Sequence, residues 1–169
     1  KTIFVGDTSV HEYPTSEQMA KIATSTARVV RLFGFEPKVA FVSHSTFGQP
    51  LTSRTKHIRK AVDILKEQKV DFEFDGDMQP DVALNSEYKE LYPFSNIVGK
   101  ANILIMPGQH SAAISYKMMK TLGDTKVIGP LLIGLGLPIE IAPLRSSTSE
   151  LINLASVAAY SADIIDYKK

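Results

Sequence analysis

The sequence of 169 residues contains no cysteine, which excludes disulfides, thiolate nucleophiles and thiolate metal sites. The same absence fits a cytoplasmic location, which we expect for this chain. No apolar run approaches the roughly 20 residues that span a bilayer, and no signal peptide is present, so we expect a soluble protein without a membrane partner. The 19 basic and 18 acidic side chains are well mixed and give a net charge of +1. Without a basic tract, no nucleic-acid partner is expected.

Several nucleotide and metal motifs are also missing. No segment matches the glycine-rich P-loop, and residues 134–138 lack the third glycine of a dinucleotide fingerprint. The four histidines are too scattered for a linear zinc motif, and His11-Glu12 lacks the second histidine of the zinc-protease pattern. Asp75 and Asp77 offer two carboxylates to a divalent cation, but two acids beside a glycine more often shape a turn or a cap. We therefore expect no metal and no NAD(P) site within this chain.

What is present is the composition of an ordinary globular protein, with 44% hydrophobic and 22% charged residues. Short apolar runs predict strands, and apolar residues at three- and four-residue steps predict helices. Thr15 with Gln18, and Ser147 with Glu150, have the spacing of capping boxes at helix starts. The predicted strands are residues 2–5, 38–42, 71–74 and 103–106, a run that begins at 127, and 139–142.

The predicted helices bury their apolar stripes against these strands. The inward residues are Met19, Ile22, Ala23, Thr26, Val29, Val30 and Phe33 in the first helix; Ile58, Ala61, Val62 and Leu65 in the second; and Leu151, Leu154, Ala155 and Ala158 in the last. The order of elements predicts an α/β fold, a mostly parallel sheet with helices on both faces in three layers. Because the chain begins with Lys1 and a strand follows at once, we expect residues 1–169 to be one domain cut from a longer polypeptide.

Small hydroxyl residues follow the predicted strand 38–42 directly. Ser43, Ser45 and Thr46, with the free backbone N–H groups of a strand end, are suited to cradle a phosphate or a carbonyl oxygen. The same residues are also typical of an ordinary turn. Position alone leaves both interpretations open.

Two further positions lie where helices begin. His110 stands between a strand and a helix, where an anion can bind, although a surface or capping role is the plainer interpretation. Arg145 and Ser146 precede the last helix and could converge on an anion there, but a capping turn at Ser147 explains the segment by itself.

Several short segments, in the same order and spacing, resemble the phosphate acetyltransferases and butyryltransferases over nearly the whole chain. The resemblance implies the C-terminal half of the phosphotransacetylase module. The matching segments are Asp7-Thr8 before Pro14-Thr15, residues 35–40 leading into Ser43-His44-Ser45, residues 75–79, residues 99–102 with Met106-Pro107, and Gly129-Pro130 with Gly134 and Pro138.

The resemblance also implies where catalysis would occur. Members of this family move an acetyl group between coenzyme A and phosphate in a cleft between two lobes, using a Ser, an Arg and an Asp near the last helix. In this sequence Pro143 stands at the Ser, Leu144 at the Arg and Glu150 at the Asp. Proline and leucine offer no hydrogen-bond donor or positive charge, and the loss of one such donor typically slows a reaction by about a hundredfold or more. We therefore assign no catalytic residue, although Arg145 lies one position away.

This pattern is similar to the C-terminal domain of multidomain NADP-dependent malic enzymes. That resemblance implies a non-catalytic domain that senses acetyl-CoA and mediates assembly. The parent enzyme would carry the malic enzyme domain in the same chain and use NADP and a divalent metal. The expected acyl-CoA or phosphate contacts are Ser43, Ser45, Thr46, His110, Arg145 and Ser146.

The resemblance also bears on assembly. The apolar faces of residues 111–122 and 148–162 are candidates for self-association into a dimer or a larger oligomer. The final helix, residues 147–162, is expected to pack on the lobe that the chain lacks. The alternative function is an active phosphate acyltransferase that moves an acyl group between coenzyme A and phosphate.

Overall fold

A computed structural model describes residues 1–135 and 137–164. The chain divides into two compact units, Lys1–Ile114 and Ser115–Lys169, which we describe separately. No helix in the described part of the chain is both long and apolar enough to cross a bilayer.

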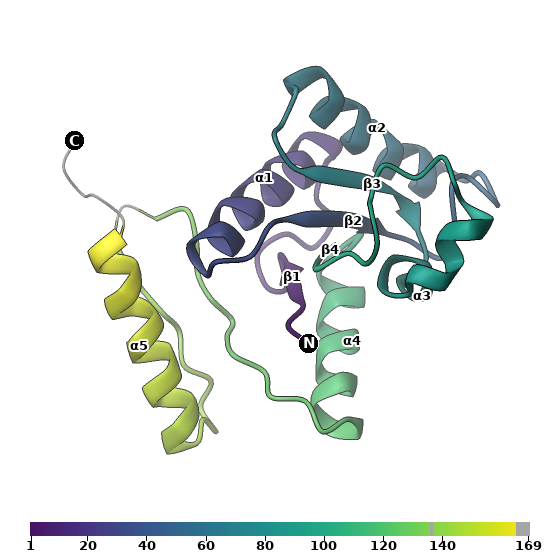
Figure 1. Ribbon diagram of the computed structural model, residues 1–169. Coiled ribbons are helices and arrows are strands. Elements are labelled where there is room, and N and C mark those ends of the chain that lie inside the picture. The colour runs from purple at the N-terminus through teal and green to yellow at the C-terminus, as the bar shows by residue number, and fades with distance from the viewer. Residues whose placement is uncertain (136, 165–169) are drawn as a thin grey trace. The chain divides into compact units, whose positions relative to one another are not determined.

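The first unit is built on a four-stranded, parallel sheet with the strand order β1-β4-β2-β3. Helices α1 and α2 cover one face, and α3 and the start of α4 cover the other (Figure 1). This arrangement confirms the predicted α/β class with helices on both faces. The elements are β1 (Phe4–Gly6), α1 (Ser16–Leu32), β2 (Lys38–Val42), α2 (Ser53–Gln68), β3 (Glu73–Met78), α3 (Pro80–Leu84), the 3-10 helix η1 (Ser86–Leu91), β4 (Ile103–Ile105) and α4 (Gln109–Leu122).

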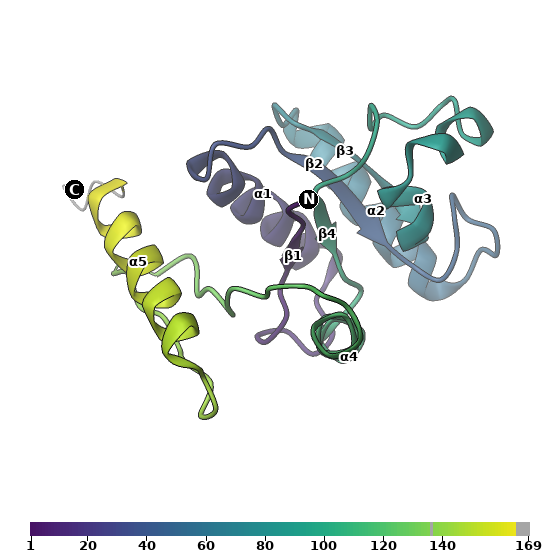
Figure 2. The same cartoon turned by 60° about the horizontal axis from the view of Figure 1, so that its bottom comes forward.

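The two central strands are apolar on both faces, because successive side chains of a strand point to opposite sides. One set of their residues packs under α1 and α2, and the alternate set packs against α3 and the first turns of α4. Figure 2 looks along α4, whose Ala112 is fully buried in the second cluster. The first set is Val39, Phe41, Ile103 and Ile105, and the second is Ala40, Val42, Leu104 and, just past β4, Met106.

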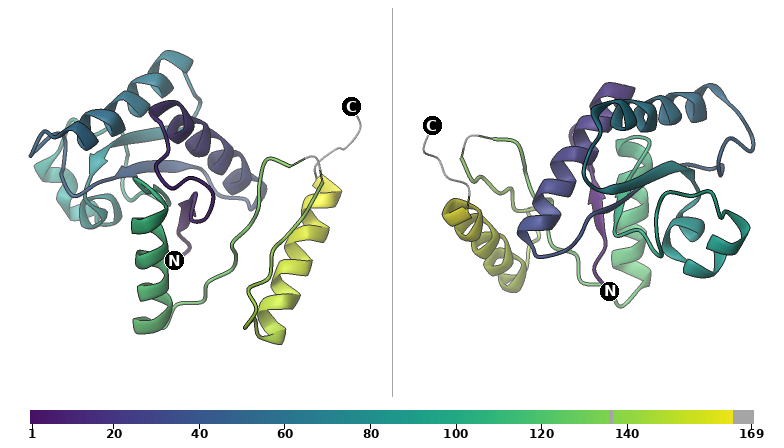
Figure 3. Two further views of the ribbon diagram at one scale, coloured as in Figure 1. Left: turned by 180° about the vertical axis from the view of Figure 1, so that it is seen from behind. Right: turned by 45° about the horizontal axis from the view of Figure 1, so that its top comes forward.

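Helices α1 and α2 each begin at a capping box. The two helices lie side by side (Figure 3). The predicted capping box at α1 is confirmed: the Thr15 N–H donates to Gln18 Oε1 at 2.7 Å, and the Gln18 N–H donates to Thr15 Oγ1 at 3.2 Å. A second box, Thr52 with Thr55, starts α2. All four predicted inward residues of α2 are buried, as are Met19, Ala23, Thr26 and Val30 of α1.

The third strand differs from its prediction. Residues 71–74 were expected to form it, but β3 runs from Glu73 to Met78 and includes both acids that were assigned to a strand end. The pairing with β2 shifts between Phe41 and Val42, whose partners are Gly76 and Met78, so Asp77 is the extra residue of a β-bulge. Hydrogen bonds to both carboxylates offset the low strand propensity of aspartate.

The second unit contains the end of α4, an extended segment and helix α5 (Thr148–Ile164). The strands predicted from residue 127 and at 139–142 are wrong for the described residues: neither run is hydrogen-bonded into a sheet. The predicted βαβ unit therefore has its first strand and its helix, but the described residues form no second strand. Of the α5 residues that were expected to face inward, only Leu154 is buried, and Leu151 is 47% exposed.

The close packing of β2 on β3 predicts a penalty for a side chain at Gly76. A Cβ at this position would lie 2.7 Å from Phe41 Cβ and 2.8 Å from Phe41 O, and φ is +154°. We expect Gly76→Ala to lower the free energy of unfolding by at least about 2 kcal/mol in urea titrations. Gly34→Ala is the control, since φ is +81° there but no atom lies within 4 Å, and it should lose only about 1 kcal/mol. Equal losses would contradict this packing argument.

Candidate functional site

All four strands run in the same direction, so the loops that follow them emerge at one edge of the sheet. We call residues 7–12, 43–49, 77–79 and 107–111 the carboxyl edge. Neighbouring strands here lead to helices on opposite faces, which is where ligands bind in open α/β sheets. The carboxyl edge is therefore the candidate site of the first unit.

A fully buried carboxylate organises the middle of the carboxyl edge. The β-bulge turns Asp77 toward the loop after β2, where its Oδ2 accepts hydrogen bonds from Ser45 Oγ and, at 3.3 Å, from the Gly48 N–H. Its Oδ1 is buried without a hydrogen-bond partner, and Arg59 Nε lies 4.0 Å away. Because a buried charge is costly unless it is paired, Arg59 compensates part of this carboxylate's charge.

The three predicted phosphate-binding hydroxyls lie together but are engaged within the protein. Ser45 donates to Asp77, and Thr46 Oγ1 accepts from the Gln79 N–H at 3.2 Å. Ser43 Oγ lies 3.4 Å from both the nitrogen and the Oγ of Ser45. All three residues are at most 8% exposed. The hydroxyls therefore connect the loop after β2 to the end of β3, and the side chains that this loop presents to solvent are those of His44 and Gln49.

The other acid of β3 also has protein partners. Asp75 Oδ2 accepts from the Asn96 N–H at 2.7 Å, and its Oδ1 accepts from the Gly76 N–H at 2.9 Å. The described residues contain no group of three or more His, Cys, Asp or Glu side chains that could hold a metal ion. Asp75 and Asp77 thus fix loops to the sheet.

An aspartate–histidine pair lies at the end of β1, and the sequence analysis missed it. Asp7 is 7% exposed in its side chain, and its Oδ2 pairs with His11 Nδ1 while its Oδ1 accepts from the Val10 N–H at 2.9 Å. An aspartate directly after a strand with a histidine four residues later is the signal that could have found this pair. The pair closes the loop that follows β1.

The start of α4 lies against the same loop. The Gln109 N–H donates to Glu12 O at 3.2 Å. A Cβ at Gly108 would be 2.6 Å from that carbonyl oxygen, so only glycine fits there. The side chain of His110, in the first turn of α4, is exposed. The carboxyl edge thus presents His44 and His110 to solvent.

The remaining predicted contacts belong to the second unit. Arg145 is exposed, and Ser146 Oγ donates to Pro143 O at 2.8 Å. Pro143 and the fully exposed Leu144 offer no donor or charge from their side chains. The structure thus groups Ser43, Ser45 and Thr46 in the loop after β2 and places His110 in the first turn of α4, which follows the neighbouring strand β4. Arg145 and Ser146 belong to the other unit.

Glu150, at the position where the family resemblance implies a base, is already engaged. Its Oε1 accepts from Lys120 Nζ at 2.6 Å, and its Oε2 accepts from the Ser147 N–H at 2.8 Å in the predicted capping box, which is confirmed. The hydrogen bond from Lys120, followed by those from Ser147, lowers the pKa of Glu150 to about 2. An acid with so low a pKa is a weak proton acceptor at neutral pH.

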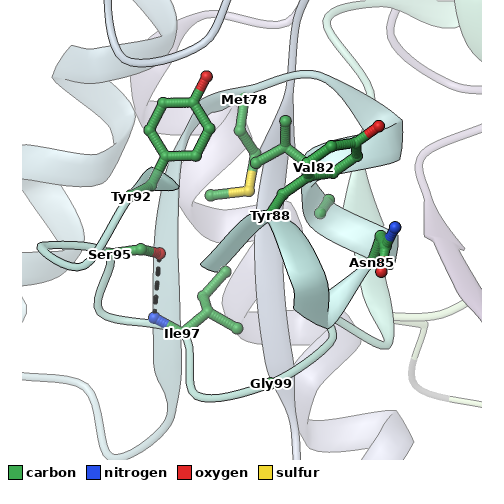
Figure 4. A pocket seen from close by; sticks show the side chains of 9 residues that line it. Met78, Val82, Asn85, Tyr88, Tyr92, Ser95, Ile97 and Gly99 are labelled. Atoms are coloured by element: carbon green, nitrogen blue, oxygen red, sulfur yellow. Dashed lines mark hydrogen bonds between the residues drawn. The ribbon is translucent and has the colours of Figure 1, made fainter. Parts of the chain in front are cut away.

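A small hollow lies on the first unit between α3, η1 and the end of β3 (Figure 4). Tyr88 and Tyr92 flank it, with Met78 between them, and the Ile97 N–H donates to Ser95 Oγ at its rim. Its volume of about 20 Å³ holds roughly one water molecule. A hollow in the second unit, beside Pro143 and Glu150, is smaller still. Neither hollow admits an acyl-CoA.

The buried Asp77 carboxylate predicts unequal roles for two neighbouring serines. Ser45→Ala removes a hydrogen bond to a buried charge, and we expect it to lower the free energy of unfolding by about 2 kcal/mol in urea titrations. Ser43→Ala removes only contacts of 3.4 Å and should cost less than about 1 kcal/mol. The interpretation fails if the two variants are equally stable.

The contacts of Glu150 predict its titration. We expect carboxyl NMR to give a midpoint near pH 2 for Glu150, because the ionised form is held by Lys120 and Ser147. The stabilisation is present above the ordinary pKa of 4.5 and is lost as the pH falls toward 2. Lys120→Met should move the midpoint toward 4.5, whereas Lys117→Met, three residues earlier on α4, should not. A midpoint near 4.5 in the unsubstituted protein would refute the ion pair.

Comparison with known proteins places these features in a family. The profile described as "Phosphate acetyl/butaryl transferase" matches residues 1–159. The chain is 49% identical to an NADP-dependent malic enzyme of Rhizobium meliloti, over 96% of this chain and 21% of that protein. It is 34% identical to a phosphate acetyltransferase of Clostridium acetobutylicum, over 95% of this chain and 49% of that protein.

Solved structures agree with the sequence comparison. A phosphotransacetylase from Streptococcus pyogenes superposes with a TM-score of 0.88 and 32% identity, over 94% of this chain and 49% of that one. The chain thus spans about half of the Clostridium phosphate acetyltransferase and about a fifth of the Rhizobium malic enzyme. On this evidence the chain belongs to the phosphate acetyl/butyryl transferase family.

Proposed function

We propose that this chain is a non-catalytic, regulatory and oligomerising domain of a cytoplasmic NADP-dependent malic enzyme, and that it binds acetyl-CoA. The observation that carries the proposal is the chemistry at residues 143–150. Pro143 and Leu144 provide no donor for a developing oxyanion, and Glu150 is bound to Lys120 and Ser147. Acyl transfer needs both functions, whereas binding does not.

The relatives support the same choice of parent protein. Five of the similar proteins, with identities from 34% to 49%, bear the name NADP-dependent malic enzyme, in one case with the qualifier "probable". Such a parent would supply NADP and a divalent metal through its malic enzyme domain, in the same polypeptide. This chain would contribute the acyl-CoA site.

Regulation requires that the effector distinguish two states of the protein. In our proposal acetyl-CoA binds one arrangement of the transferase-like lobes more tightly, and that difference in affinity biases the malic enzyme active site. In the first unit, the exposed His44 and His110 at the carboxyl edge would contact anionic parts of the ligand. In the second unit, the exposed Arg145 is a separate candidate contact. The buried hydroxyls of Ser43, Ser45 and Thr46 would hold the shape of that edge. Assembly would use the apolar residues of α4 and α5.

The second candidate is an active phosphate acyltransferase. The observation that favours it is the close superposition on phosphotransacetylases, with a TM-score of 0.88. In that case Arg145 would replace the missing guanidinium, and Glu150 would have to leave Lys120 to act as a base. A fold shared with phosphotransacetylases does not by itself provide a guanidinium at residue 144 or an unpaired carboxylate at residue 150.

The intact polypeptide that carries this chain separates the two functions. We expect it to form no acetyl-CoA from acetyl phosphate and coenzyme A above background, and we expect acetyl-CoA to change the kinetics of malate oxidation. Acetyl transfer that is lost in Glu150→Gln would establish the transferase instead. A polypeptide without transfer and without any acetyl-CoA effect would refute the proposed function and leave an assembly role.

A single substitution tests the proposed acyl-CoA contact. Arg145→Ala should weaken acetyl-CoA binding by about tenfold in calorimetry of the intact polypeptide, because it removes a charged donor to the ligand's phosphates. Arg28→Ala is the matched control: Arg28 is also exposed, but it lies on α1, where no contact with the ligand is proposed. Unchanged affinity in Arg145→Ala would exclude that residue from the site.

A further inference from the structure

Arg59, in the second turn of α2, lies beside the middle of the carboxyl edge. Its Nε is 4.0 Å from Asp77 Oδ1, which is too far for a hydrogen bond, and its side chain is 48% exposed. Within residues 1–135 and 137–164, no acceptor is hydrogen-bonded to this guanidinium. An arginine carries five N–H donors in a planar fork. Arg59 therefore faces solvent with its donors unused.

Glycine at position 48 allows the guanidinium to lie directly on the loop after β2. A Cβ at Gly48 would be 2.7 Å from Arg59 Nη1, which is closer than a Cβ comes to its neighbours in real proteins. Gly48 is buried, and its N–H donates to Asp77 Oδ2 at 3.3 Å, so the same turn contacts both charged groups. The guanidinium is thus placed by packing and by charge.

Neutralisation of Asp77 explains only part of this arrangement. Buried charges are normally paired by direct hydrogen bonds, yet Asp77 Oδ1 is fully buried and has none. An arginine that served only this carboxylate would be expected to donate to it, but the guanidinium stops 4.0 Å away. Donors that do not reach the buried oxygen are available to an anion outside the protein.

The start of α2 also carries more positive charge than the buried carboxylate requires. Arg54 and Lys56 are exposed in its first turn, which contains no acidic residue, and Arg54 lies over the ring of Tyr13 at 5.4 Å from the centroid. Cations at a helix N-terminus oppose the helix dipole, so helix stability does not account for them. Arg54, Lys56 and Arg59 against the single charge of Asp77 leave a formal excess of +2, three minus one.

We propose that Arg59, assisted by the charges of Arg54 and Lys56, binds a phosphate group at the carboxyl edge. A guanidinium forms paired hydrogen bonds with phosphate oxygens, and an excess of two positive charges matches a phosphate dianion better than a carboxylate. The chemistry is the same whether the phosphate belongs to coenzyme A or to a separate phosphorylated ligand. Only the first of these cases rests on the proposed function.

Calorimetry of the intact polypeptide with inorganic pyrophosphate as the probe tests this site. Saturating NADP is present, so that the proposed nucleotide site of the parent enzyme is filled. We expect Arg59→Ala to weaken pyrophosphate binding by about tenfold, because it removes charge-assisted hydrogen bonds. Arg28→Ala, which removes an exposed arginine of α1, should leave the affinity unchanged. Equal affinities of the two variants, or no binding by the unsubstituted polypeptide, would overturn the proposal.

A second pair of substitutions displaces the guanidinium without removing its charge. Gly48→Ala places a methyl group against Arg59 Nη1 at a φ of +82°. Gly99→Ala is its match, since φ is +80° there and no atom lies within 4 Å. With both variants folded by circular dichroism, Gly48→Ala should weaken pyrophosphate binding by about threefold or more, and Gly99→Ala should not. Full affinity in Gly48→Ala would contradict the proposal and restrict Arg59 to supporting Asp77.

Acetyl-CoA distinguishes the two sources of the phosphate. If the phosphate is that of coenzyme A, saturating acetyl-CoA should abolish the pyrophosphate binding that depends on Arg59. If it belongs to a separate ligand, that binding should persist, and both results support the site. A polypeptide that binds pyrophosphate through Arg59 but whose malate kinetics ignore acetyl-CoA would retain this site and lose the proposed function.

Discussion

The two-sided burial of β2 and β4 is the constraint on which the first unit depends. Residues such as Phe41 and Val42 face opposite layers, so neither face of these strands meets water. Their backbone groups must then pair with neighbouring strands on both sides, which places β4 and β2 at the centre of the order β1-β4-β2-β3. The helices that connect parallel strands return the chain to the start of the sheet, so that every strand runs in the same direction. The carboxyl ends of all four strands therefore lie at one edge. The carboxyl edge is thus a product of core packing.

At that edge the polar groups nearest to Asp77 form hydrogen bonds with its buried carboxylate. Asp77 is fully buried at a β-bulge, and its carboxylate takes the Ser45 hydroxyl and the Gly48 N–H. An uncompensated charge in this position would be strongly destabilising. The hydroxyls of Ser45 and Thr46, which the sequence pattern suggested as ligand contacts, therefore stabilise the loop after β2. In the proposed function, a ligand is recognised by side chains that remain exposed, such as His44 in the loop after β2 and His110 in the first turn of α4.

The two units differ in whether their apolar residues find partners within the chain. The first buries its apolar stripes on both sides of a sheet, whereas the described residues of the second bury only Leu154. The same contrast holds for chemistry. Glu150 caps α5 and pairs with Lys120, and Pro143 and Leu144 stand nearby without a donor. In the proposed function, the family's fold is kept for binding. The donors for acyl transfer are replaced by Pro143 and Leu144, and the carboxylate of Glu150 is held by Lys120 and Ser147.

The sequence by itself determined the features that depend on near neighbours. Capping boxes at Thr15 and Ser147, the inward stripe of α2 and the apolar strands 38–42 and 103–105 arise from spacings of a few residues. The segments that carry the family resemblance are equally local. They were sufficient to identify the fold class and the family.

Only the tertiary structure decided which distant groups meet. It extended β3 through Asp75 and Asp77, joined Ser45 to a carboxylate 32 residues away, and brought the loop after β1 against the start of α4. It also left the runs from 127 and at 139–142 without a ladder among the described residues. The spacing of apolar residues in the sequence indicates only that a segment is apolar enough to be buried. A strand forms only where another strand supplies its hydrogen bonds. A polar side chain is free to bind a ligand only where it does not form a hydrogen bond with a buried group of the protein.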